Sequence, residues 1–387
     1  MRALVVTWAP GGNLPPLLAA ASVLGRRGHD VALLASGETR GAAERLGFEV
    51  TGYRRSADPD PRIAFEAQAE AMMATMAGAD IALDARDAVE ELGADLAIVD
   101  CMLPAAIAGA RATGTPTASL VHFLYGLART RMLQGAGGWT SDLEALAATH
   151  RLLGLAPVLD GLTAWEAPEL VLVTAPRWLD LDAGAPDHVV HAGPLNVDTR
   201  ASGAHRAGAD RPRVLLSFST TVMEGQAALI DRVSEAIAGL DVDAVLTLGH
   251  AVDLDAVHVP EGVEVVPFAD HDRLMPGCAA VISHGGLGTV LRAFAHGVPQ
   301  LLLALGRDQP FNADRVEQLE AGIRLPADAP PQRIRTALDA LLTGGRYRAA
   351  AERLANRIAA ENPDRTAAEA LERIARTLPP NRPPRRA

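Results

Sequence analysis

The residues best suited to chemistry lie in a glycine-rich turn in the second half of this 387-residue chain. Residues 280–282 form an apolar, strand-like run, and Ser283 to Thr289, with the sequence SHGGLGT, separate it from a helix expected to reach about residue 296. Glycines let backbone N–H groups at a helix start approach an anion, and the helix dipole favours a phosphate there. His284 can donate to a diphosphate oxygen, and Thr289 can add a hydroxyl. The turn therefore predicts a phosphate site, with an ordinary capped turn as the alternative.

Two further loops carry polar residues after apolar runs. Asp308 and Gln309 follow residues 301–305, and an acid beside an amide suits the adjacent hydroxyls of a sugar ring. Ser217 to Thr221 supply several hydroxyls after another apolar run. Taken alone, the first pair is typical of a solvated loop and the second of a Ser/Thr turn. Beside the glycine-rich turn, they predict a phosphate and a sugar bound next to each other.

Parallel sheets are the elements that would position these loops. Residues 3–9 are apolar throughout, Pro15 and Pro16 suit the first turn of the next helix, and Gly28 is placed to end it before an apolar run at 31–34. Further strands are predicted at 48–53, 96–100 and 117–122, and then at 214–219, 244–248, 263–268, 279–283 and 300–305. Helical segments alternate with them, and residues 63–92 and 125–167 add helical insertions. The pattern predicts α/β domains with doubly wound parallel sheets, whose ligands bind beyond the carboxyl ends of the strands.

The length of the chain predicts two domains, since one hydrophobic core rarely serves so many residues. We expect an N-terminal Rossmann-like domain at 1–195, a linker at 196–212 and a C-terminal Rossmann-like domain at 213–362. A C-terminal helix at 363–378 is expected to pack back on the N-terminal domain, and 379–387 to form a disordered tail.

The composition of the chain limits the kinds of partner that we expect it to bind. The formal net charge of -11 argues against nucleic acid, which is bound by clustered Lys and Arg. The two cysteines, Cys101 and Cys278, lie far apart without metal-ligand spacing, so we expect no disulfide, no metal site and a reducing cytoplasm. The apolar run at the start, about seven residues long, is too short for a signal peptide or a membrane span.

Three motifs carry a family resemblance. His284-Gly-Gly-x-Gly-Thr, Gly297-Val-Pro-Gln, and Asp308-Gln with Asn312 resemble the donor signature of GT-B fold family 1 glycosyltransferases, especially bacterial natural-product enzymes of the antibiotic and macrolide type. The resemblance implies two facing Rossmann-like domains, with the acceptor bound by the N-terminal domain at 1–195 and the nucleotide sugar by the C-terminal domain at 213–362. It also implies inverting, metal-independent transfer of a sugar, which we expect to be a deoxyhexose, from UDP or dTDP to a small aglycone. No cofactor is expected besides this co-substrate, and homodimerisation is left open.

The resemblance and the three loops together predict the residues that bind the donor, the activated sugar. They are Gly12, Ser219, Thr220, Thr221, Val266, Phe268, His284, Gly285, Gly286, Gly288, Thr289, Asp308 and Gln309. Apolar and methionine-rich surfaces accommodate rigid aglycones, which predicts an acceptor pocket in the first half. Its expected residues are Phe65, Met72, Met76, His122, Phe123, Tyr125 and Trp139, with core packing as the alternative for each.

The expected catalytic base is absent. Family members usually carry His in the motif Gly-His-x-x-Pro, whereas this chain has Asn13 between Gly12 and the sequence Leu-Pro-Pro. An Asn amide can orient a group but cannot take a proton at neutral pH. Asp100, at a strand end, is the first candidate for a replacement base, with helix capping as its alternative. His122, after the next strand, is the second candidate, with a role as pocket wall as its alternative.

Asn13 is also compatible with chemistry that needs no replacement base. The acceptor could be a phenol, an enol-like carbon or a heteroaromatic N–H that needs little help, or the protein could be a sugar-binding or partner-dependent relative with degenerate catalysis. Two different enzyme classes share such folds. A nicotinamide-dependent oxidoreductase would need GxGxxG with an acidic residue about 20 positions on, and no strand is followed by that pattern. A GT-B epimerase would convert a nucleotide sugar without any acceptor.

Overall fold

The chain folds into two compact units. The computed structural model describes residues 1–8, 11–56, 65–134, 143–158, 160–181, 184–195, 211–220, 222–248, 252, 254–266 and 271–377. The first unit comprises Met1–Asp60, Gln68–Val197 and Asn362–Ala387, and the second comprises Pro61–Ala67 and Asp198–Glu361. No helix in these described ranges has both the length and the apolar character needed to cross a membrane.

The first unit is built on a seven-stranded sheet in which every pairing is parallel. Its strands are β1 (Arg2–Val6), β2 (Asp30–Leu34), β3 (Glu49–Thr51), β4 (Leu96–Asp100), β5 (Thr117–Val121), β6 (Leu170–Val173) and β7 (Val189–His191). They lie in the order β3-β2-β1-β4-β5-β6-β7, and Val5 of β1 is in register with Leu33 on one side and Ile98 on the other. The order in which strands are added therefore reverses between β1 and β4: β2 and β3 lie on one side of β1, and the later strands lie on the other. Ligands of such sheets bind at this reversal point.

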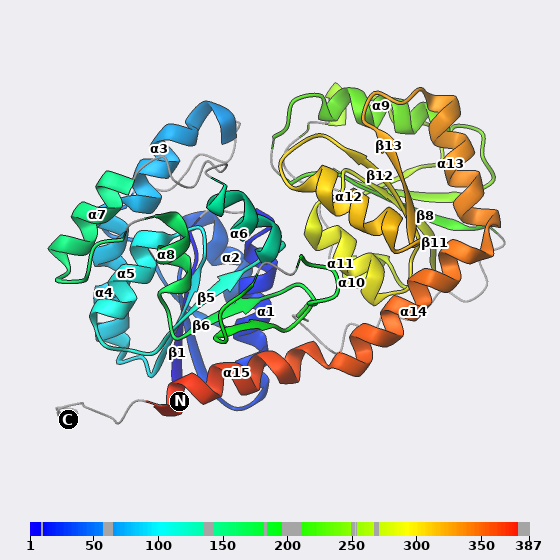
Figure 1. The fold of residues 1–387 in the computed structure, drawn as a ribbon. Helices are drawn as coiled ribbons and strands as arrows, with labels where there is room; N and C mark the ends of the chain where they lie inside the picture. Colours follow the sequence, from blue (N-terminus) through cyan, green and yellow to red (C-terminus); the bar gives the residue numbers. More distant parts are fainter. Residues whose placement is uncertain are drawn as a thin grey trace. The chain divides into compact units, whose positions relative to one another are not determined.

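Helices cover both faces of this sheet (Figure 1). They are α1 (Leu14–Arg26), α2 (Gly37–Arg45), α3 (Phe65–Ala77), α4 (Ala79–Leu92), α5 (Pro104–Ala112), α6 (Tyr125–Leu133), α7 (Leu143–Leu152), α8 (Gly161–Glu166) and α15 (Pro363–Thr377). Helix α1 starts with two prolines, as predicted, and Gly28 follows its end with a φ of +83° that other residues rarely adopt. Its buried Leu17, Leu24 and neighbours form one core with alternate residues of β1, β2, β4, β5 and β6.

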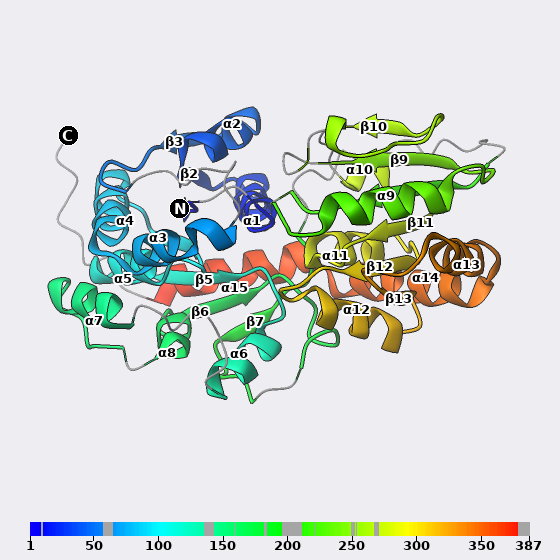
Figure 2. The ribbon, with the colours of Figure 1, turned by 90° about the horizontal axis from the view of Figure 1, so that it is seen from above.

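Helix α15 belongs to this first core although it comes from the end of the sequence. Its Ala367, Leu371 and Ile374 are buried in the cluster that holds α1, and Figure 2 shows the helix alongside β5 and β6. Glu372 accepts hydrogen bonds from Arg27 at 2.7 and 2.9 Å and is 2.9 Å from His29. The C-terminal helix is thus held to the first unit by an apolar stripe and by ion pairs.

The second unit has a six-stranded sheet, again parallel throughout. Its strands are β8 (Arg213–Ser217), β9 (Asp243–Thr247), β10 (Glu264–Val266), β11 (Cys278–Ser283), β12 (Gln300–Ala304) and β13 (Gly322–Pro326), in the order β10-β9-β8-β11-β12-β13. Its helices are α9 (Gln226–Ile237), α10 (His271–Leu274), α11 (Leu287–Ala295), α12 (Gln309–Gln318), α13 (Pro331–Thr343) and α14 (Gly345–Glu361), with a 3₁₀ turn at Leu254–Ala256.

The two faces of the second sheet have separate cores. Helices α9 and α13 bury their apolar stripes on one face, and α11 packs against the other, as Figure 1 shows. The order of strands reverses between β8 and β11. The prediction of two parallel α/β sheets is confirmed, and three strands were not predicted from the sequence, namely β6, β7 and β13.

Candidate functional site

Three side chains meet at the reversal point of the first sheet. Asn13 follows β1, Asp100 ends β4 and His122 follows β5, so the topology alone brings them to one edge. Asn13 occupies the N-cap position of α1, yet its side chain makes no cap hydrogen bond. Instead, its Nδ2 donates to Asp100 Oδ2 at 2.7 Å. The sequence-predicted catalytic residues are therefore brought together, with Asp100 in the middle.

Asp100 is a hydrogen-bond hub. Its side chain is 1% exposed, and its Oδ1 accepts from the backbone N–H of Met102 at 2.9 Å and lies 3.1 Å from His122 Nε2. The Met102 contact orders the turn between β4 and α5, whereas the N-cap position of α5 is Leu103 and no side chain caps this helix, so Asp100 does not have the capping role that was its alternative. Both carboxylate oxygens therefore already accept hydrogen bonds from groups of the protein.

Cys101 lies beside this hub. Asp100, Cys101 and His122 form the group of possible ligand atoms found within 4.8 Å of one another in the described part of the chain. Burial, and next the charge of Asp100, raise the pKa of the Cys101 thiol well above its usual value. A protonated thiol is a poor ligand, and the Asp100 oxygens already have donors. The donor set therefore fits a hydrogen-bonded network better than a metal centre.

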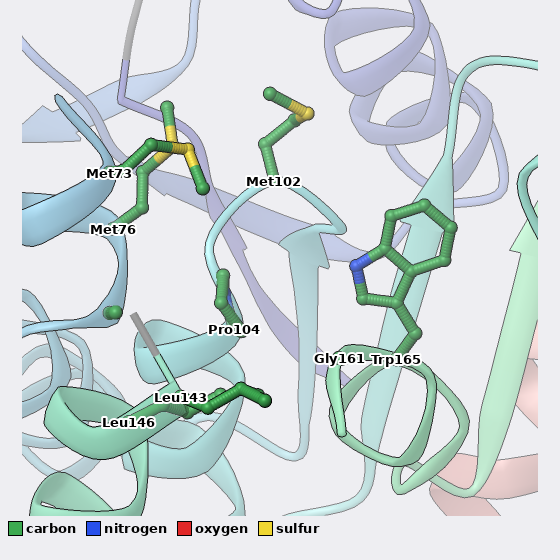
Figure 3. Close-up of a pocket in the computed structure, with 9 residues that line it drawn as sticks. Met73, Met76, Met102, Pro104, Leu143, Leu146, Gly161 and Trp165 are labelled. Atoms are coloured by element: carbon green, nitrogen blue, oxygen red, sulfur yellow. The ribbon is translucent and has the colours of Figure 1, made fainter. Parts of the chain in front are cut away.

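An apolar pocket opens next to the network. Met73 and Met76 of α3, Met102 after β4 and Trp165 of α8 surround it, together with Ala77, Pro104, Leu143, Leu146 and Gly161. Figure 3 shows the three methionine side chains and the Trp165 ring around the same space. The Phe123 ring lies 5.1 Å from that of Trp165 and 5.1 Å from that of His122, between centroids. Aromatic packing thus connects the pocket wall to the hydrogen-bonded network.

The acceptor residues predicted from the sequence fall into three groups. Met76 lines the pocket and Phe123 borders it, whereas Met72 is buried in α3 and is not among the lining residues. Trp139 lies outside the described residues, as does the side chain of Phe65. Sequence reasoning missed Met73, Met102 and Trp165. Met102 could have been found, because it lies two residues after a strand-terminal carboxylate.

Tyr125 requires a correction. We expected it to face an acceptor, but its side chain is fully buried and its hydroxyl donates to Glu166, which also pairs with Arg129. Burial and the neighbouring carboxylate raise the pKa of Tyr125, which keeps the phenol protonated. The residue therefore ties α6 to α8.

His284 dominates the corresponding edge of the second sheet. It follows β11 at the reversal point, is 8% exposed, and has no hydrogen-bond partner for Nδ1 within the described ranges. Burial lowers its pKa from about 6.5 to about 4, a hydrogen bond with the Ser217 backbone opposes that shift, and the positive charges of His271 and Arg307 add to it. The ring is therefore neutral at pH 7. A buried polar atom without a partner is rare in proteins and marks a candidate functional position.

The glycines around His284 are required by the conformation and the space of the turn. Gly285 adopts a φ of +87°, and a side chain at Gly286 would place Cβ 2.7 Å from His284 Nε2. Gly286 is the N-cap of α11 and Gly288 lies in its first turn, so unobstructed N–H groups start this helix. Thr289, also in that turn, places its hydroxyl 3.4 Å from Ser217 Oγ.

Hydroxyls and a second histidine surround this helix start. Ser217 ends β8, and its Oγ lies 3.1 Å from His271 Nε2 of α10. The neutral His284 ring, hydroxyls and backbone N–H groups thus converge at the reversal point of the second sheet. Such a set of donors can hold a diphosphate without a fixed charge of its own.

Gln309 also requires a correction. We expected it to face a sugar, but it is 3% exposed, and its Oε1 accepts from the backbone N–H groups of Leu305 and Gly306 at 2.9 and 3.2 Å. Its Nε2 contacts Met223 Sδ at 3.1 Å. Its amide therefore orders its own loop. This local bonding is invisible in the residue types alone.

Asp308 is half-buried and is connected to the glycine-rich turn. Its Oδ2 accepts from Asn312 Nδ2 at 2.8 Å, and the same Nδ2 donates to Gly285 O at 3.0 Å. Asn312 therefore joins the loop after β12 to the loop after β11. This contact keeps the Asp308 carboxylate beside the predicted phosphate site.

The positions of the other residues predicted to bind the sugar donor say less about a ligand. The backbone of Ser219 exchanges two hydrogen bonds with the Gln226 amide at 3.1 Å, Thr220 is exposed, and Val266 ends β10 half-buried. Gly12 belongs to the first unit. Thr221 and Phe268 lie outside the described residues.

Comparison with known proteins finds related sequences over the whole chain. Residues 231–374 match the family described as "Erythromycin biosynthesis protein CIII-like, C-terminal domain". An aklavinone 7-beta-L-rhodosaminyltransferase from Streptomyces galilaeus is 33% identical over 45% of this chain, a stretch that spans only 41% of the relative's length. An L-demethylnoviosyl transferase from Streptomyces niveus is 27% identical over 98% of this chain and 100% of its own.

Solved structures share the fold. The glycosyltransferase VinC, determined in complex with dTDP, superposes with a TM-score of 0.72 at 22% identity and covers 97% of this chain and 99% of its own. The two parallel α/β units therefore form the GT-B fold.

Proposed function

We propose that this chain, which belongs to the bacterial natural-product glycosyltransferases of family 1, transfers a sugar from a nucleoside-diphosphate sugar to a small natural-product acceptor. The observation that carries the proposal is the buried, neutral His284 with its unpartnered Nδ1 in a glycine-rich turn at the reversal point of the second sheet. Relatives named as glycosyl transferases over part or all of the chain support it.

The donor is proposed to be a UDP- or dTDP-activated deoxyhexose, with dTDP favoured. The structural relative VinC was solved with dTDP, and the sequence relatives are named for the transfer of rhodosaminyl and demethylnoviosyl groups. With its one ring proton on Nδ1, His284 would donate to the diphosphate, as would the Thr289 hydroxyl and the first N–H groups of α11, and Asp308 would face the sugar. The groups that face the diphosphate are neutral donors, and their hydrogen bonds strengthen as negative charge develops on the leaving group.

The reaction is proposed to be a single displacement that inverts the anomeric carbon and needs no metal ion. The acceptor oxygen attacks C1 as the bond to the diphosphate breaks, through an oxocarbenium-like state. The apolar pocket beside Asn13, Asp100 and His122 would hold the aglycone, because methionine and tryptophan side chains adapt to rigid apolar ligands. Substrate transfer then depends on a donor site in one unit and an acceptor site in the other.

Calorimetric titration with dTDP and with UDP tests the donor site. We expect the wild type to bind one of them, and His284→Ala to weaken that binding at least tenfold, since a hydrogen bond to a charged group contributes about 1.5–3 kcal/mol. Gly286→Ala should act similarly, because its Cβ would displace the His284 ring.

Two substitutions in the same unit serve as controls. His258→Ala changes an exposed histidine, and Gly345→Ala adds a Cβ with no atom within 4 Å. Both should bind as the wild type does. Failure of the wild type to bind either nucleotide would overturn the proposal in favour of a degenerate, auxiliary relative. Equal affinity of the wild type and His284→Ala would remove His284 from the site.

A further inference from the structure

We propose that His122 is the general base of this enzyme, and that Asp100 is a positioning residue that acts through it. The inference rests on the proposed function and names the residue that replaces the usual histidine of the first loop. In this chain the family position holds Asn13, and the same carboxylate that would orient a histidine there is instead 3.1 Å from His122 Nε2.

Asp100 is badly placed to take a proton from an acceptor itself. Its side chain is 1% exposed, Oδ2 is occupied by Asn13, and Oδ1 is shared by Met102 N and His122. A base must come within hydrogen-bond reach of the proton it removes. The protein's own donors stand in the way of that approach on both oxygens.

His122 has the properties of a base that Asp100 lacks. Because a carboxylate only accepts, Nε2, the ring nitrogen that faces Asp100, carries the proton of the neutral ring, and Nδ1 of that ring keeps its lone pair. Nδ1 makes no hydrogen bond with any described residue, and the side chain is 12% exposed, compared with 1% for Asp100. The result is a carboxylate and imidazole pair with its basic atom unused, the arrangement that activates hydroxyl groups in hydrolases.

The surroundings of His122 lead to the acceptor pocket. Its ring packs edge-on against Phe123, which packs against Trp165 in the pocket wall, and Met102, whose N–H binds Asp100, lines the same pocket. An aglycone in this pocket would have the Asp100–His122 pair at its border. The network and the pocket therefore form one site within the first unit.

Asn13 fits this assignment as a second positioning residue. Its Nδ2 donates to Asp100 Oδ2 at 2.7 Å, so it fixes the carboxylate from the side opposite His122. An amide can do this at every pH because it does not titrate. The exchange of His for Asn at position 13 thus removes a base from the first loop and leaves the carboxylate to serve His122.

The proton and electron balance of the step is simple. The acceptor O–H gives its proton to His122 Nδ1 as the new O–C1 bond forms. The C1–O bond to the diphosphate breaks, and its electron pair leaves on the phosphate oxygen. The imidazolium is stabilised by Asp100, and it returns its proton to solvent after the products leave. No oxidant, reductant or further reactant is needed.

The first experiment reads the tautomer directly and needs no substrate. In protein labelled with ¹⁵N-histidine, long-range ¹H–¹⁵N spectra at pH 8 should show His122 with Nε2 protonated and Nδ1 bare, assigned by loss of its signals in His122→Gln. A neutral ring with the proton on Nδ1, or a ring that is still doubly protonated at pH 8, would overturn the proposal, since neither leaves a basic Nδ1.

The second experiment measures turnover, with dTDP-glucose as donor and 2-(2-naphthyl)ethanol, a fluorescent alcohol whose aliphatic hydroxyl needs a base, as acceptor. His122→Gln should lower kcat at least 100-fold, the usual contribution of a general base, with dTDP affinity unchanged. His188→Gln, which alters a first-unit histidine bonded to the Glu166 carbonyl, is the matched control and should keep the wild-type rate.

Rescue separates a base from a structural residue. Added imidazole should restore turnover in His122→Ala but not in Asp100→Asn, and Asn13→His in the His122→Gln background should recover part of the rate by returning a ring to the other side of Asp100. Full activity of His122→Gln, or a loss that neither imidazole nor Asn13→His restores, would overturn the assignment of His122.

The outcomes distinguish the two proposals. A wild type that fails to bind dTDP or UDP contradicts the proposed function, whereas the tautomer of His122 is decided in the same protein without nucleotide. A wild type that binds dTDP and transfers sugar at a rate independent of His122 leaves the proposed function intact and removes only this inference.

Discussion

His122 and His284 occupy equivalent places in the two units and have opposite environments. Each follows a strand at or next to the reversal point of a parallel sheet. His122 lies 3.1 Å from a buried carboxylate, whereas burial, with no carboxylate contact among its described neighbours, lowers the pKa of His284 to about 4. The His284 environment keeps its ring neutral at pH 7, whereas the His122 environment supplies a carboxylate as hydrogen-bond partner.

The difference shows how one topology serves two kinds of chemistry. The edge of the first sheet carries Asp100, and an adjacent carboxylate stabilises an imidazolium once it forms. The edge of the second sheet carries glycines and hydroxyls, which hold an anion through neutral donors. The strand order places the histidines, and the residues on the neighbouring strand ends decide what each histidine can do.

The largest expected effect sharpens the contrast through the stability of the fold. Because the folded pKa of His284 is depressed to about 4, the unfolded chain binds a proton near pH 6.5 that the folded chain rejects. Wild-type stability should therefore fall, relative to His284→Gln, as the pH drops from 6.5 to 4, by about 3 kcal/mol in total. Chemical denaturation of both proteins across this range measures the difference.

His258→Gln is the control for this measurement, because its exposed ring should produce no such pH-dependent difference. A difference between wild type and His284→Gln that stays constant from pH 6.5 to 4 would show that His284 titrates normally. The contrast with His122 would then have no electrostatic basis.

The sequence predicted the parts of the fold that carry strong periodic signals. Five strands of the second sheet and five of the first were expected, because each is an apolar run followed by a loop and a helix. Strands β6 and β7 were missed, since four and three residues are too few to show a pattern. β13 was missed because Arg324 and Pro326 are typical of loops, and they are tolerated here because β13 lies at the sheet edge.

The sequence predicted those residues of the candidate site that lie at the ends of strands. Asp100 and His122 were both named because β4 and β5 are consecutive in sequence and adjacent in the sheet. The hydrogen bond from Asn13 to Asp100, and the use of the Gln309 amide within its own loop, depend on rotamers that residue types do not specify. Trp165 lines the pocket because of the way α8 packs, and a local sequence pattern does not reveal this packing.

A smaller effect is expected from Asn13→Ala, which tests whether the first site is a positioned network. The variant loses one hydrogen bond to the Asp100 carboxylate, and about 1 kcal/mol of lost positioning corresponds to a roughly fivefold fall in kcat. The dTDP affinity should stay unchanged, because the proposed diphosphate contacts lie in the second unit. Steady-state turnover of dTDP-glucose with 2-(2-naphthyl)ethanol measures kcat, and calorimetry measures the affinity.

A fall of 100-fold or more in kcat for Asn13→Ala would contradict the assignment of Asn13 to a supporting role. It would mean that the amide contacts the reacting atoms, and it would weaken the case for His122 as the group that does so.

The smallest effect concerns the ion pairs that hold α15 to the first unit, and it tests whether the two sites can be perturbed separately. Hydrogen bonds from Arg27 and then His29 lower the pKa of Glu372 to about 2. A depressed carboxylate pKa gives stability that is present above the unfolded value, near 4.5, and is lost as the pH falls toward 2. Arg27 is 41% exposed, so solvent screening limits the contribution to about 0.5–1 kcal/mol.

Glu372→Gln should therefore lower the free energy of unfolding by that amount at pH 7 and by less at pH 3, where the wild-type carboxylate begins to protonate. Denaturation at the two pH values measures it, with Glu361→Gln, an exposed helix residue of the second unit, as the control. Binding of dTDP should be unaffected, because the ion pairs and their apolar stripe belong to the first core alone. A loss of dTDP affinity in Glu372→Gln would mean that α15 influences the nucleotide site as well, and that the two histidines cannot be compared as independent centres.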